Sequence, residues 1–173
     1  MILKGLKRNA IKKSIETHLK KRDSSSTGIS SLKTLAVLVD ASYAVNIASI
    51  VKLASELQVD PENLKVVGYK EDKDLEDDKD AAYYNDKSFA VNGSIRNSAL
   101  QDFVNKDYDV LINFYEEDKL ELNYVAAVSK AKLKIGFAEV DNRINDLIIG
   151  STTHDTNLFI AELKKYLKIL QVI

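Results

Sequence analysis

The segment from Tyr108 to Glu139 constrains the fold more than any other part of the chain. Residues 110–115 form a nearly continuous apolar run, which is typical of a strand that is covered on both faces. Apolar side chains then recur at helical spacing over residues 120–131, and a second short apolar run begins at Leu133. About 30 residues is the usual size of a strand–helix–strand unit with parallel strands. The segment therefore predicts an α/β architecture.

The same alternation of patterns extends along the rest of the chain. Further strand-like runs occupy residues 34–39, 64–69 and 146–150, and further helical patterns occupy residues 44–57, 98–105 and 156–170. This order predicts an α/β fold of the Rossmann-like three-layer type, with a mostly parallel sheet of about five strands and helices on both faces. Residues 71–80 hold seven acids and two lysines, so we interpret them as a solvated loop.

Charge is distributed unevenly along the chain. The net charge is −1, but residues 1–22 hold eight basic residues against one acid, Glu16. Because apolar residues recur among these lysines at helical spacing, we predict a basic amphipathic helix over residues 1–22. The small, polar residues 23–31 predict a flexible linker, and residues 32–173 are expected to form the Rossmann-like α/β domain.

Composition excludes several classes of site. The chain has no cysteine, so it can form neither a disulfide nor a thiolate metal site. No apolar run approaches the ~18 residues of a membrane span, and we expect a cytoplasmic protein. Neither a Gly-x-Gly-x-x-Gly sequence nor a P-loop occurs, and residues 116–118 would place three acids at a helix start that should otherwise attract phosphate. We therefore expect no nucleotide cofactor and no other cofactor.

The basic N-terminal segment is the main indication of function. Its cations could neutralise backbone phosphates and release counterions. We therefore predict a non-catalytic cytosolic binding module that engages RNA or a ribonucleoprotein through this helix. The predicted partner-binding residues are Lys4, Lys7, Arg8, Lys12, Lys13, Lys20, Lys21 and Arg22. Three alternatives stay open, since the segment could dock on another protein, lie on an anionic membrane as an adaptor, or fold back on the acidic domain.

A candidate pocket is expected where the predicted strands end, because ligands of parallel α/β sheets bind outside the carboxyl ends of the strands. The candidate residues there are Asp40, Ser42, Tyr43, Asn113, Tyr115, Glu116 and Glu139. An alternative function is therefore a carboxylate- or metal-dependent enzyme, in which Asp40, Glu116 and Glu139 gather around a divalent cation of unknown identity. The same carboxylates could instead simply favour the helix starts beside them.

Two stretches of the central unit resemble a known family. Residues 107–113 read Asp-Tyr-Asp-Val-Leu-Ile-Asn, and residues 127–137 read Ala-Val-Ser-Lys-Ala-Lys-Leu-Lys-Ile-Gly-Phe. Both resemble motifs in the N-terminal half of heptosyltransferase-like glycosyltransferases, which implies a Rossmann-like half-domain. Because the sugar-nucleotide half of those enzymes has no counterpart before Ile173, transferase activity is not expected. The whole chain also resembles a small, uncharacterised bacterial family of stand-alone Rossmann-like domains.

Overall fold

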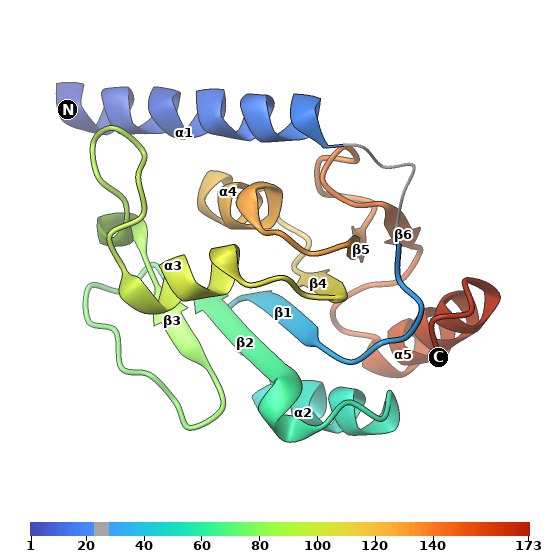
Figure 1. Cartoon of the computed structure of the whole chain (residues 1–173). Coiled ribbons are helices and arrows are strands. Elements are labelled where there is room, and N and C mark those ends of the chain that lie inside the picture. Colours follow the sequence, from blue (N-terminus) through green and yellow to red (C-terminus); the bar gives the residue numbers. More distant parts are fainter. Residues whose placement is uncertain (23–27) are drawn as a thin grey trace.

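The computed structural model describes residues 1–22 and 28–173 and has a parallel sheet at its centre (Figure 1). Its strands are β1 (Leu35–Asp40), β2 (Leu64–Tyr69), β3 (Ala82–Tyr84), β4 (Val110–Phe114), β5 (Leu133–Phe137) and β6 (Leu147–Ile149). They are arranged in the order β3-β2-β1-β4-β5-β6, and every neighbouring pair is parallel. The predicted parallel sheet is therefore confirmed. Of the predicted linker, residues 23–27 lie outside the described residues.

Helices cover both faces of this sheet (Figure 1). The helices are α1 (Ile2–Lys21), α2 (Ile47–Glu56), α3 (Ser98–Asn105), α4 (Leu120–Val128) and α5 (Thr156–Ile169), with short 3₁₀ turns η1 (Pro61–Asn63) and η2 (Asp86–Ser88). Side chains of α1, α3 and α4 form one apolar core with the sheet, and side chains of α2 and α5 form the other. The predicted three-layer α/β sandwich and its N-terminal helix are thus confirmed.

The sheet has one strand more than the five expected. Strand β3 is three residues long and pairs with the edge of β2, where Val67 faces Ala82. So short a strand shows no alternation in the sequence, and its position depends on contacts made elsewhere. Tyr84 provides one of these contacts, because its ring is fully buried and its hydroxyl donates to the carbonyl oxygen of Glu121 at 3.1 Å.

Helix α1 packs against α4 (Figure 1). Ile11 and Ile15 are only 1% and 7% exposed, and they join the core on the α4 side of the sheet. Gly93, at φ +81°, lies beneath this helix, where a Cβ would come within 3.3 Å of Ala10. Burial of an isoleucine side chain contributes about 1.5–3 kcal/mol, so these apolar contacts hold α1 on the domain.

Ion pairs reinforce the same docking. They join Lys7 to Asp86 at 2.7 Å, Arg8 to Glu121 at 3.3 Å, Arg143 to Glu16 at 2.9 Å, and Arg22 to Asp146. The exposed Arg143–Glu16 pair contributes little to stability, and in the more buried pairs the cost of desolvation offsets much of the attraction. They therefore fix the orientation of α1 more than they stabilise it.

A buried lysine of β5 caps the C-terminal end of α4. Lys134 is fully buried, and its Nζ donates to the carbonyl oxygens of Ala126 at 2.6 Å and Ala127 at 3.1 Å. The last carbonyls of a helix lack partners within the helix, so these bonds satisfy groups that would otherwise be buried without donors. Burial lowers the pKa of Lys134 to about 7, and the nearby Arg22 guanidinium acts in the same direction.

The docking of α1 can be tested with a matched pair of substitutions. Ile11→Ala should lower the free energy of unfolding by about 2–5 kcal/mol, because it leaves a cavity between α1 and α4. Leu6→Ala removes the same kind of side chain from an exposed position of the same helix, so it should change stability by less than about 0.5 kcal/mol. Urea unfolding of both variants measures the difference. Equal losses would show that α1 does not dock as described.

The buried charge of Lys134 predicts a dependence of stability on pH. Between about pH 7 and its ordinary pKa of 10.5, the unfolded chain binds this proton and the folded chain does not. The free energy of unfolding should therefore rise across this window because of Lys134. Lys134→Met removes the effect, so the stability advantage of the wild type over this variant should grow from pH 6 to pH 9.5. The exposed Lys130→Met serves as control, and an equal trend in both variants would contradict the burial.

Candidate functional site

The order of the strands creates a crevice between β1 and β4. From β1 the chain proceeds to β2 and β3 on one side, whereas β4, β5 and β6 continue on the other side. The winding of the sheet therefore reverses between β1 and β4, and open α/β sheets bind their ligands at the carboxyl ends of such a pair. A cavity of about 560 Å³ lies at this point, on the face of the sheet that α2 and α5 cover.

The floor of this switch-point cavity is apolar. Val37 of β1 and Ile112 and Phe114 of β4 point to the same face of the sheet, and Ile50 and Leu53 of α2 form a wall. Because the floor side chains come from neighbouring parallel strands, their positions are fixed by the register of the sheet. The floor therefore offers a rigid surface for the apolar part of a ligand.

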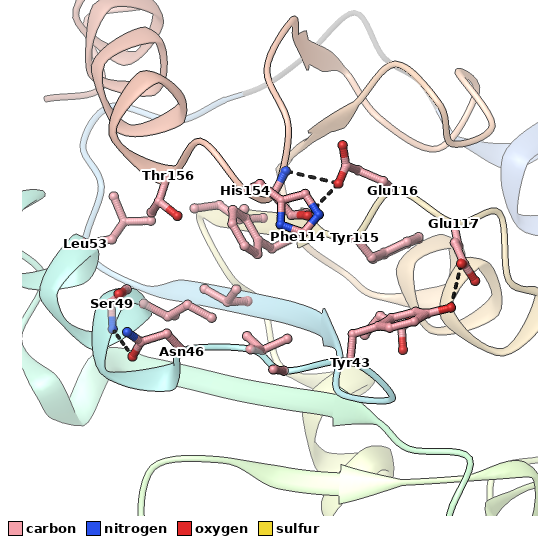
Figure 2. A pocket seen from close by; sticks show the side chains of 17 residues that line it. Tyr43, Asn46, Ser49, Leu53, Phe114, Tyr115, Glu116, Glu117, His154 and Thr156 are labelled. Carbon is pink, nitrogen blue, oxygen red and sulfur yellow. Dashed lines mark hydrogen bonds between the residues drawn. The ribbon is translucent and has the colours of Figure 1, made fainter.

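The rim of the switch-point cavity is polar and comes from three segments. They are the loop after β1 with the start of α2, the loop after β4, and the loop before α5 with the first residue of that helix. They contribute Tyr43, Asn46, Ser49, Glu116, Glu117, Thr153, His154 and Thr156. Figure 2 shows Asn46 and Ser49 on one side of the cavity and Glu116 and His154 on the other. Asn46 also caps α2, since its side-chain oxygen accepts from the backbone N–H of Ser49 at 3.2 Å.

Glu116 ties two of these segments together (Figure 2). Its Oε2 accepts from the backbone N–H of Thr153 at 3.1 Å and from the hydroxyl of the same threonine. The carboxylate is half-buried, and these bonds fix its orientation. The loop after β4 and the loop before α5 are therefore joined at the rim.

Lys119 pairs with carboxylates at the cavity and beside it. Its Nζ lies 2.8 Å from Asp40 Oδ2, 3.2 Å from Glu71 Oε1 and 3.5 Å from Glu117 Oε2. Although burial disfavours its charge, the Asp40 and Glu71 carboxylates raise the pKa of Lys119. Tyr43 donates its hydroxyl to Glu117 Oε1 at 2.7 Å, and this bond, together with Lys119, lowers the pKa of Glu117. One cation thus pairs with three carboxylates at the same edge of the sheet.

The structure divides the predicted pocket residues. Asp40, Tyr43, Tyr115 and Glu116 line the cavity, whereas Ser42, Asn113 and Glu139 do not. Asn113 is excluded by the alternation of β4, because its side chain points to the opposite face, where its Nδ2 donates to Asn145 Oδ1 at 2.7 Å. Glu139 follows β5 and is exposed.

The carboxylates do not gather as the metal hypothesis requires. Across residues 1–22 and 28–173, no group of three or more His, Cys, Asp or Glu side chains is placed to hold a metal ion. Asp40 is paired with Lys119, and Glu116 is held by Thr153. The predicted combination of Asp40, Glu116 and Glu139 is therefore absent from the described part of the chain.

Comparison with known proteins places the chain in a family. A family model matches residues 7–170, which include most of α1 and the whole sheet. The chain belongs to the family of unknown function DUF6913. Neither the curated proteins nor the solved structures contain a match to it. The glycosyltransferase resemblance of this DUF6913 chain therefore stays an expectation. In the described residues, no helix is both long enough and apolar enough to cross a membrane.

The eight N-terminal cations of the DUF6913 chain fall into two groups. Lys7, Arg8 and Arg22 pair with carboxylates of the domain, so they take part in docking. The other five are exposed, and within the described residues none of them forms an ion pair: Lys4, Lys12, Lys13, Lys20 and Lys21. For the first group, the structure agrees with the alternative in which the N-terminal segment folds back on the acidic domain. Engagement of RNA by the second group stays a prediction.

Several rim residues were not among the predicted ones. Asn46 carries a local signal, because asparagine is one of the preferred N-cap residues, and Ser49 follows in the first turn of the helix that it caps. That signal would have started the helix at residue 47 and placed both side chains at the end of β1. Thr153 carries no such signal, since its partner Glu116 is 37 residues away. Lys119 was likewise missed, because its three carboxylate partners are brought together only by the fold.

The role of Lys119 predicts a double-mutant result. Lys119→Met should lower the free energy of unfolding by about 3 kcal/mol, because it leaves the buried Asp40 carboxylate without its cation. Adding Asp40→Asn to this variant should restore most of the loss, since the uncompensated charge is then gone. Lys165→Met, which removes an exposed pair with Glu162, is the control. An additive loss in the double variant would show that the two side chains are not coupled.

Proposed function

We propose that the chain is a binding module for a small organic ligand, which it holds in the switch-point cavity. The observation that carries this proposal is the position of the cavity at the carboxyl ends of β1 and β4, where the winding of the sheet reverses. Its volume of about 560 Å³ falls within the range of small-molecule sites, roughly 300–1,000 Å³. An apolar floor with a few polar groups at the rim is also the usual composition of such sites.

The charges around the cavity favour a neutral or cationic ligand. Asp40, Glu116 and Glu117 line it, and no lysine or arginine of the described residues does so. Lys119 lies behind this rim and offsets part of the negative charge. Carboxylates at this position repel a phosphate or carboxylate ligand and accept hydrogen bonds from N–H and O–H groups. The ligand class is therefore an aromatic or aliphatic body that carries amine or hydroxyl donors.

The arrangement of the rim supports recognition. Glu116 is held by Thr153, Glu117 by Tyr43, and the α2 start by the Asn46 cap. Polar groups that are fixed before the ligand arrives lose less conformational entropy on binding. Phe114, which packs edge-on against Phe159 with ring centroids 5.3 Å apart, gives the ligand body a rigid aromatic surface.

The test uses two probes of similar shape and opposite charge. Saturation-transfer NMR should detect binding of tryptamine to the full chain and markedly weaker binding of indole-3-acetate. Ser49→Phe fills the cavity from α2 and should weaken tryptamine binding by about tenfold, a change of about 1.4 kcal/mol. Ala48→Phe places the same side chain on the neighbouring, exposed position of α2, so it should leave binding unchanged.

Two results would contradict the proposal. Equal binding by the Ser49→Phe and Ala48→Phe variants would place the probe outside the cavity. Equal binding of the two probes to the wild type would remove the assigned ligand class. Glu117→Gln tests separately how much the negative charge of the cavity contributes to ligand preference. It should reduce the preference for tryptamine over indole-3-acetate without closing the cavity.

A further inference from the structure

The outer surface of α1 carries apolar side chains that the fold does not use. Ile2, Leu3 and Leu6 are 81%, 63% and 52% exposed. They lie within the first two turns of α1, so they form one apolar tip. Figure 1 shows this end of α1 reaching past the segment between β3 and α3. The docking of α1 depends on Ile11 and Ile15 instead, which are buried further along the helix.

Further along α1, lysines lie on the same face of the helix as the apolar tip. Lys13 and Lys20 follow Leu6 at intervals of seven residues, which is close to two helical turns, so the three share one face. Lys12 and Lys21 flank this row, and all four lysines are exposed. The cations that pair with the domain, such as Arg8, belong to the docked side of α1. The exposed face therefore combines an apolar tip with a lysine row, and the described domain satisfies neither.

An anionic lipid bilayer matches both parts of this face. Apolar side chains of a surface helix enter the boundary between headgroups and acyl chains, and lysines beside them are attracted to anionic headgroups. RNA matches only the lysine row. It would leave Ile2, Leu3 and Leu6 without a partner, and α1 has no Phe, Tyr or Trp on which a base could stack.

We propose that α1, docked on the folded domain, holds the chain on the surface of an anionic bilayer. The apolar tip enters the headgroup boundary, and Lys13 and Lys20 lie over the anionic headgroups. The ligand cavity stays open in this arrangement, because it lies on the face of the sheet covered by α2 and α5, whereas α1 lies on the α4 face. The bilayer contact is thus independent of the proposed ligand site.

Vesicle co-sedimentation of the full chain tests this proposal. The chain should pellet with vesicles that contain about 30% phosphatidylserine in phosphatidylcholine, and binding to pure phosphatidylcholine should be about tenfold weaker. Raising the salt concentration should release it, because the lysine contacts are screened.

Two sets of substitutions separate the parts of the face. The triple variant Ile2→Ser, Leu3→Ser, Leu6→Ser and the triple variant Lys13→Gln, Lys20→Gln, Lys21→Gln should each reduce binding about tenfold. The matched controls should bind like the wild type. They are Ile169→Ser, which changes an exposed isoleucine of α5, and Lys52→Gln, Lys65→Gln, Lys73→Gln, which remove three exposed lysines elsewhere. All substituted positions are exposed, and thermal unfolding checks that each variant stays folded.

Three outcomes would overturn the proposal. The first is failure of the wild type to pellet with either kind of vesicle. The second is equal binding to both kinds, which would leave the lysine row without a role. The third is full binding by the serine variant together with salt-sensitive retention on single-stranded RNA that the glutamine variant loses, which would assign the face to nucleic acid. Ser49→Phe should keep vesicle binding, so failure of the ligand site and failure of the bilayer contact can be told apart.

Discussion

The parallel pairing of β1 with β4 is the contact on which the rest of the structure depends. It joins Leu35 to Val110 at one end and Val39 to Phe114 at the other, in the middle of the sheet. Asp109 fixes its start, because its Oδ2 accepts from the backbone N–H groups of Lys33 and Thr34, each at 3.0 Å. Although burial opposes its charge, these bonds and the Lys132 ammonium lower the pKa of Asp109 to about 2. The same pairing places two strand ends side by side, and the switch-point cavity lies there.

Long, continuous patterns in the sequence predicted the centre of the sheet accurately. The run at residues 64–69 coincides with β2, the run at 110–115 contains β4, and the run that begins at Leu133 starts where β5 starts. Strands in the middle of a parallel sheet are covered on both faces and are therefore rich in apolar residues. Strand β3 lacked this signal: it is as short as β6 but contains no run of branched aliphatic residues like Leu147–Ile149, and it follows closely after the acidic residues 71–80. The docking of α1 lacked it as well. The sequence does not distinguish an Ile11 that is buried against the domain from an Ile11 that is exposed for a partner. Nor does it show that Lys7 pairs with Asp86, because the two residues are 79 positions apart.

The site was predictable to the extent that it follows from strand ends. Asp40 and Glu116 were found because each directly follows an apolar run, and parallel strands bring such positions to one edge. The strand-end rule does not specify which face of the sheet a side chain points to, and for this reason it also included Asn113, which faces the α4 side. The rule also does not identify Thr153, because this residue is held at the cavity by a hydrogen bond to Glu116 and no local sequence pattern marks it.

The two proposed surfaces follow from how the chain distributes its charge. Of the eight basic N-terminal residues, only Lys7, Arg8 and Arg22 form ion pairs with the domain. Burial of Ile11 and Ile15 contributes more to the stability of the docked helix than these ion pairs do. Because docking of α1 requires few ion pairs, the other lysines of this helix face solvent. The carboxylates at the ends of β1 and β4 are meanwhile held by Lys119, a cation from the domain itself, and so they do not depend on α1. A negative cavity and a positive helix face can thus coexist on opposite sides of one sheet without neutralising each other.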